Sequence, residues 1–174
     1  MIQATALIDG NNFYAACEQS IDPYLMGRPV VILSNNDGCI VARSSEAREL
    51  GLIMGQPYFQ VREKLKRLGV IVRSSNYALY GDMSKRLMTL LKANCELLEV
   101  YSIDEAFVKL NRPINFDLRP WARKLRALIN QQLGLPITIG IGASKVQAKL
   151  SNHLAKIVPE HSGVFDLLMT NNPD

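Results

Sequence analysis

Two neighbouring acids, Asp104 and Glu105, stand between short segments at 98–103 and 106–110 that have the composition of strands. Neighbouring side chains in a regular strand point to opposite faces of the sheet. If residues 102–105 form a tight turn instead, both carboxylates project from the same end of the sheet. Carboxylate oxygens are preferred ligands of hard divalent cations, although an Asp-Glu pair at a turn is more often merely solvated.

A third acid, Asp9, follows the apolar run at 4–8 and precedes turn residues and a helical pattern that begins at Phe13. This order predicts a strand, a turn and a helix, with Asp9 at the carboxyl end of the strand. Open α/β sheets bind their ligands at that end. Asp before Gly10 and Asn11 is also ordinary turn chemistry, so the position alone leaves both interpretations open.

The composition indicates a globular chain with one core and a small inserted lobe, since 48% of its 174 residues are hydrophobic. The longest apolar runs are strand-sized and the N-terminus lacks a signal-peptide pattern, so we expect a cytoplasmic protein with no membrane partner. The net charge of +4 suits a polyanionic partner without requiring one. Three widely spaced cysteines and two histidines indicate buried free thiols, with neither zinc nor disulfides.

Residues 22–75 have the pattern of a small, basic, separately packed insertion. Strands at 30–33 and 39–42 flank an Asn- and Asp-Gly-rich segment, which predicts a hairpin. Helices are expected at 45–50 and 57–68, and a third strand at 70–73. Arg48, on the first of these helices, is a candidate cation for an anionic ligand.

Three further helices are expected at 76–95, 118–133 and 145–157, the last beginning with a capping box of Ser144 and Gln147. In the last helix, the side chains expected to face the core are Val146, Leu150, Leu154 and Ile157.

Without the insertion, and apart from an extra helix that flanks it, the predicted elements follow the split βαββαβ order of a ferredoxin-like fold in the α+β class. Its central strands are the first and the third, so Asp9 lies next to the turn that carries Asp104 and Glu105. Three converging acids repel one another, and either a raised pKa or bound cations must neutralise them. Two divalent ions about 4 Å apart can activate an attacking hydroxyl and stabilise a leaving pyrophosphate. Arg48 and Lys149 would neutralise a triphosphate.

Four stretches of the sequence resemble the Y-family translesion DNA polymerases of the UmuC type. They are DGNNFYAACE (9–18), LSNNDGCIVAR (33–43), SNYALYGDMS (75–84) and YSIDEAF (101–107). The resemblance implies a catalytic palm (1–21 and 76–165), a fingers insertion (22–75) and a C-terminal tail (166–174). It also implies that the thumb and little finger of the family are absent.

By motif position, the resemblance implies that Asp9, Asp104 and Glu105 are the catalytic residues. Together with the backbone carbonyl of Gly10, they would hold two Mg²⁺ ions.

The resemblance also implies a nucleotide-binding set. Tyr14 would be the steric gate that excludes a ribose 2′-hydroxyl, and Arg48 and Lys149 would contact the triphosphate. Many members have Tyr three residues before the Arg, whereas this chain has Ser45, which removes one triphosphate hydrogen bond.

The function that follows is error-prone lesion bypass by a DNA-directed DNA polymerase in the SOS response to DNA damage. Expected partners are damaged primer-template DNA, deoxynucleoside triphosphates, a UmuD-type protein and a recombinase filament. One alternative is a truncated, non-catalytic UmuC-like module that binds a partner protein. Another is a nucleotidyl cyclase, against which Tyr14 argues because a cyclase must accept ribose.

Overall fold

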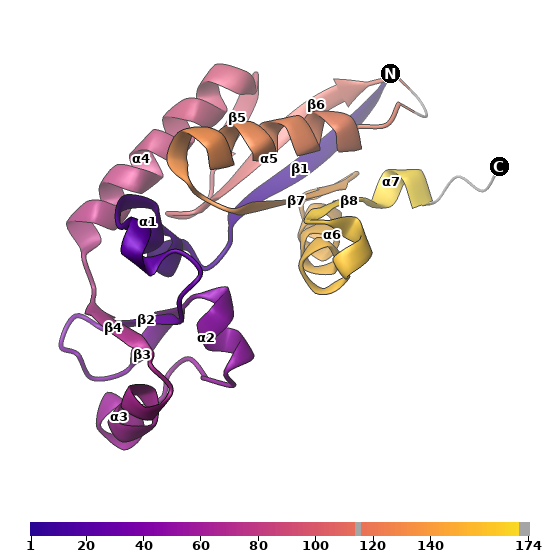
Figure 1. The fold of residues 1–174 in the computed structure, drawn as a ribbon. Coiled ribbons are helices and arrows are strands. Elements are labelled where there is room, and N and C mark those ends of the chain that lie inside the picture. Colours follow the sequence, from indigo (N-terminus) through magenta and orange to yellow (C-terminus); the bar gives the residue numbers. More distant parts are fainter. Residues whose placement is uncertain (114–115, 171–174) are drawn as a thin grey trace. The chain divides into compact units, whose positions relative to one another are not determined.

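The computed structural model describes residues 1–113 and 116–170 (Figure 1). The chain forms two compact units, one made of Met1–Asn11 with Ser84–Asp174 and the other of Asn12–Met83. The predicted insertion, 22–75, falls within the second unit. The last four residues of the predicted tail, 171–174, lie outside the described residues.

The first unit is built on a five-stranded sheet in the order β5-β6-β1-β7-β8. Its strands are β1 (Ile2–Gly10), β5 (Leu97–Val100), β6 (Glu105–Arg112), β7 (Ile137–Gly142) and β8 (Val164–Asp166). The first four have the order of a ferredoxin-like sheet, with β1 and β6 at its centre, and β8 adds a parallel edge strand beside β7. The predicted α+β fold is therefore confirmed.

Helices lie against both faces of this sheet, as Figure 1 shows for α5 (Arg119–Leu133) and α6 (Lys145–Ile157) on either side of β7. The six residues of β7 are all buried, as expected for a strand covered on both faces. The unit also contains part of α4 (Tyr77–Asn94), the short α7 (Leu167–Thr170) and a 3₁₀ turn, η2 (Pro159–His161).

Helix α6 has the predicted bounds but not the predicted buried face. It packs through Ala148, Ser151, Asn152 and Ala155, whereas Val146, Leu150 and Ile157 are 78%, 50% and 57% exposed. The reason is the close contact between α6 and Gly140 of β7. If Gly140 carried a Cβ atom, that atom would lie 2.0 Å from the backbone nitrogen of Asn152. Because the helix backbone approaches the strand this closely, only small side chains fit between them. The predicted core stripe of α6 was therefore wrong.

The second unit has a three-stranded sheet in the order β3-β2-β4, with β2 (Val30–Leu33) pairing antiparallel to β3 (Ile40–Arg43) and parallel to β4 (Ile71–Ser74). The predicted hairpin is thus confirmed. The helices are α1 (Phe13–Ile21), α2 (Ser45–Glu49), α3 (Tyr58–Arg67) and the remainder of α4, with a 3₁₀ turn, η1 (Pro23–Leu25). The core contains Val31, Leu33, Ile40, Ala47, Leu52, Val61, Leu65 and Val70.

The three cysteines are free thiols, of which Cys17 and Cys95 are buried as predicted, whereas Cys39 is only partly buried. Across residues 1–113 and 116–170, no helix is both long and apolar enough to cross a bilayer.

Candidate active site

Pairing of the two central strands brings Asp9 and Glu105 directly opposite each other. Opposed residues of an antiparallel pair project from the same face, with Cβ atoms about 4.5–5.5 Å apart. The Gly10 nitrogen also donates a hydrogen bond of 3.0 Å to the Asp104 carbonyl, which fixes the end of β1 to the turn before β6. The fold thus brings the three predicted acids to one end of the first unit's sheet.

Ser102 organises the turn that carries the other two acids. Its hydroxyl donates to Asp104 Oδ1 at 2.9 Å and accepts from the Glu105 nitrogen at 3.1 Å. Ser84, on α4, holds the same turn by donating to the Ile103 carbonyl at 2.5 Å. The turn therefore orients Asp104 and begins β6 at Glu105, whereas the sequence predicted Glu105 within the turn.

The environment of Asp9 and Asp104 disfavours their ionised forms. Burial raises the pKa of Asp9, Glu105 raises it further, and Lys156 partly offsets both effects. The pKa of Asp104 is also raised, mainly by burial and additionally by the charge of Asp9, whereas the Ser102 hydrogen bond opposes this rise. The site consequently carries more negative charge than its surroundings stabilise.

A lysine that sequence reasoning missed makes the closest contact with the site. Lys156 Nζ lies 2.7 Å from Asp9 Oδ1, and the two side chains are 37% and 13% exposed. Lys156 follows Lys149 by seven residues, which is about two helical turns, so both lie on the same side of α6. This seven-residue spacing is the sequence feature that could have identified Lys156 as a site residue.

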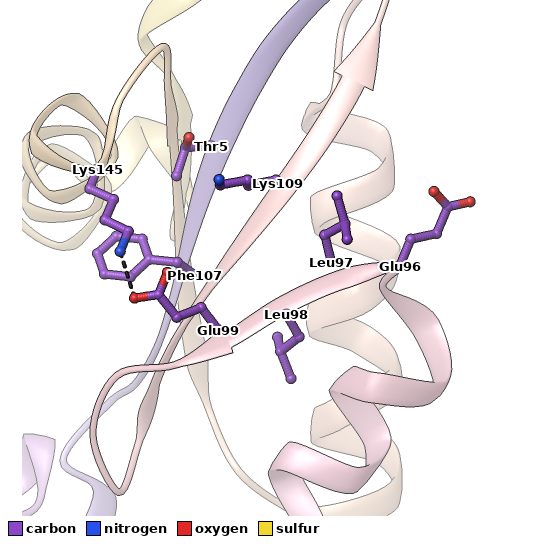
Figure 2. Close-up of a pocket in the computed structure, with 8 residues that line it drawn as sticks. All are labelled: Thr5, Glu96, Leu97, Leu98, Glu99, Phe107, Lys109 and Lys145. Carbon is purple, nitrogen blue, oxygen red and sulfur yellow. Dashed lines mark hydrogen bonds and ion pairs between the residues drawn. The ribbon is translucent and has the colours of Figure 1, made fainter.

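Lys149 contacts Tyr101, which directly precedes the turn at Ser102. Its ammonium group donates to the Tyr101 hydroxyl at 3.1 Å and lies 4.2 Å from the centre of the Tyr101 ring. A groove of about 320 Å³ is lined by Lys145, Glu99 and Phe107, among others, and the Lys145 ammonium group lies 2.5 Å from the Glu99 carboxylate. Figure 2 shows these side chains. Of the three lysines on α6, Lys156 pairs with a site acid, Lys145 pairs with Glu99, and Lys149 contacts Tyr101.

The donor set suits a hard cation. Within the described parts of the chain, no three or more His, Cys, Asp and Glu side chains gather as a ready metal-ligand group. The three carboxylates nevertheless share one end of the sheet, and the raised pKa values of Asp9 and Asp104 show that added positive charge would stabilise them. Oxygen ligands of this kind fit Mg²⁺.

The other two predicted site residues belong to the second unit. Tyr14, in the first turn of α1, is half-buried and stacks on Tyr80 with ring centres 4.4 Å apart and planes 13° apart. Arg48 is exposed in the last turn of α2, a short helix capped by the Ser44 hydroxyl, which accepts from the Ala47 nitrogen.

Comparison with known proteins shows which family the chain resembles. A model of the impB/mucB/samB family matches residues 8–153. The chain is 49% identical to "Protein UmuC" of Salmonella typhimurium strain LT2, over 93% of this chain and 39% of that protein. It is 36% identical to "DNA polymerase IV" of Corynebacterium diphtheriae, over 86% of this chain and 34% of that protein. The chain thus spans about two fifths of the length of these relatives.

Solved structures show the same fold. The insertion ternary complex of Dbh DNA polymerase superposes with a TM-score of 0.81 at 24% identity, covering 94% of this chain and 48% of the other. The crystal structure of DinB from Sulfolobus solfataricus gives a TM-score of 0.78 at 25% identity, covering 94% and 48%. Each of these structures is about twice the length of this chain.

Proposed function

The chain belongs to the impB/mucB/samB family, and we propose that it forms the catalytic part of an error-prone DNA-directed DNA polymerase that copies damaged templates. The observation that carries the proposal is the meeting of Asp9, Asp104 and Glu105 at one end of the sheet, where burial and mutual repulsion raise the pKa values of both aspartates. A site with such an excess of negative charge is suited to nucleotidyl transfer assisted by cations.

In this proposal Asp9, Asp104, Glu105 and the carbonyl oxygen of Gly10 hold two Mg²⁺ ions. When bound, such ions activate a primer hydroxyl and stabilise the leaving pyrophosphate. The chain's own contribution is to fix the carboxylates: β1 positions Asp9, and the Ser102 hydroxyl positions Asp104.

The cationic side chains have a separate role. Lys156 forms an ion pair with Asp9, and we propose that it transfers its hydrogen bond to the triphosphate when a nucleotide binds. Lys149 and Arg48 are proposed as further triphosphate contacts, and Tyr14 as the filter against ribose. Proposed partners are damaged primer-template DNA, deoxynucleoside triphosphates, a UmuD-type protein and a recombinase filament, with a cytoplasmic location in the SOS response.

Primer extension on an abasic template tests the proposal. The full chain is assayed with Mg²⁺, both alone and with the C-terminal part of a longer relative added. Asp104→Asn should lower extension at least a hundredfold, because the variant loses a charged ligand. Asp37→Asn is the matched control, since Asp37 is an exposed acid in the β2–β3 turn, and it should leave extension unchanged. Extension that survives Asp104→Asn would contradict the proposal and favour a non-catalytic module that binds a partner protein.

A further inference from the structure

A buried acid of the second unit, Glu18, lies outside the proposed catalytic set. It is only 8% exposed and lies one turn after Tyr14 on α1. Its Oε1 accepts a hydrogen bond of 2.9 Å from the hydroxyl of Tyr80, a residue that is completely buried. Burial raises the pKa of Tyr80, and the bond to Glu18 raises it further, so the phenol keeps its proton and remains a donor.

The ring of Tyr80 is in turn the surface on which Tyr14 rests. The two rings are stacked, with centres 4.4 Å apart and planes 13° apart. Tyr77 meets both rings edge-on, at 6.1 Å from Tyr14 and 6.0 Å from Tyr80. Tyr14 itself is only half-buried. The position of the Tyr14 ring therefore depends on the buried Tyr80 ring, and the hydroxyl of Tyr80 is held by Glu18.

We propose that Glu18 is a positioning residue for sugar discrimination, acting through Tyr80 on the ring of Tyr14. The inference rests on the proposed role of Tyr14 as the filter against ribose. A filter of this kind works by collision with a single hydroxyl group, so a displacement well below 1 Å changes its effect. The hydrogen bond from Tyr80 to Glu18 prevents the supporting ring from sliding, and the stacked ring of Tyr14 consequently keeps its depth and tilt.

The test compares the dissociation constants of ATP and dATP. A purely structural role of Glu18 would change the stability of the chain without changing the ratio of these constants. Dissociation constants of dATP and ATP are measured with the full chain and Mg²⁺, without DNA. Glu18→Leu and Tyr80→Phe should each lower the ratio of the ATP constant to the dATP constant by about five- to tenfold, the equivalent of one hydrogen bond. Glu18→Gln, which keeps an acceptor for the Tyr80 hydroxyl, should hold the ratio within about twofold.

A double variant separates positioning from folding. Each single change leaves one buried polar group without its partner, which lowers stability, whereas Glu18→Leu combined with Tyr80→Phe removes both polar groups. The double variant should therefore regain thermal stability relative to the single variants while its nucleotide ratio stays low. A ratio that recovers together with stability would overturn the proposal.

Tyr14→Ala distinguishes failure of this inference from failure of the proposed function. If Tyr14→Ala lowers the ratio but the Glu18 and Tyr80 variants leave it at the wild-type value, only the positioning role is overturned. If Tyr14→Ala leaves the ratio unchanged, or if the wild-type chain does not bind dATP, the filter and the inference fail together.

Discussion

Asp9 experiences opposing influences from its neighbours. Burial and Glu105 disfavour its charge, whereas the Lys156 ammonium group, 2.7 Å away, favours it. Lys156 has a larger effect on this pKa than Glu105 has, and the pKa of Asp9 remains raised because burial has the largest effect. Acids in surroundings that disfavour their charge are a common feature of functional sites, where stability is reduced in favour of binding.

Asp104→Asn should stabilise the metal-free chain at neutral pH. The raised pKa of Asp104 means that the folded state disfavours the carboxylate, so its cost to stability is present above the raised pKa and absent below the unfolded value of about 3.9. Removing the charge should add about 0.5–2 kcal/mol to the free energy of unfolding at pH 7.5. Urea unfolding in EDTA at several pH values measures the change. A variant less stable than wild type at pH 7.5, or a gain that persists at pH 3.5, would contradict this interpretation.

Lys156→Gln should have opposite effects on two ligands. Removing the ammonium group from Asp9 eliminates a competitor for cations, so the affinity for Mg²⁺ without nucleotide should rise severalfold. The affinity for dATP should fall about tenfold, since a charge-assisted hydrogen bond to phosphate is lost. Calorimetric titrations measure both constants. Lys145→Gln is the control, because Lys145 bonds to Glu99 in the groove, and equal effects of the two substitutions would contradict the assignment of Lys156.

At the scale of elements, helix α6 shows what a sequence pattern can and cannot specify. Its start at Lys145 was predictable, because the Ser144 hydroxyl accepts from the Gln147 nitrogen as a capping box requires. Its buried face was not, because hydrophobic spacing says nothing of how closely the helix approaches β7. The contact at Gly140 selects small residues. The packing of α6 on β7 also determines where Lys156 lies. The sequence alone therefore indicated only that Lys156 and Lys149 lie on the same side of the helix.

Two substitutions in α6 should therefore differ sharply in their effect on the free energy of unfolding. Leu150→Lys alters a half-exposed side chain and should change the free energy of unfolding by less than about 0.5 kcal/mol. Ala148→Leu inserts a large side chain into the contact with β7 and should cost about 1–3 kcal/mol. Urea denaturation of both variants measures the two changes in unfolding free energy. A larger loss for Leu150→Lys than for Ala148→Leu would restore the original prediction for this helix.

At the scale of the whole molecule, the order of elements was sufficient to predict how the acids meet. Pairing β1 with β6 brings Asp9 opposite Glu105 across almost a hundred intervening residues. Long-range ion pairs were not predictable in the same way. Arg112, at the end of β6, is 2% exposed and bonds to Asp166 in β8 at 2.9 Å, although neither residue stands in a recognisable motif.

Arg112→Met should cost about 3–5 kcal/mol of unfolding free energy, since it leaves the Asp166 carboxylate buried without its cation. Replacing both residues, with Arg112→Met and Asp166→Leu, should recover most of the loss. Thermal and urea unfolding measure both variants. A single variant as stable as wild type would show that the pair does not tie β8 to the sheet.

Calorimetric titration of Mg²⁺ and dATP into the full chain shows whether Asp9, Asp104 and Glu105 form a cation site. We expect wild type to bind dATP in a Mg²⁺-dependent manner, and Asp9→Asn and Asp104→Asn each to weaken this binding at least tenfold, whereas Asp37→Asn should not. Binding of equal strength in wild type and both site variants would show that the three acids do not form a cation site.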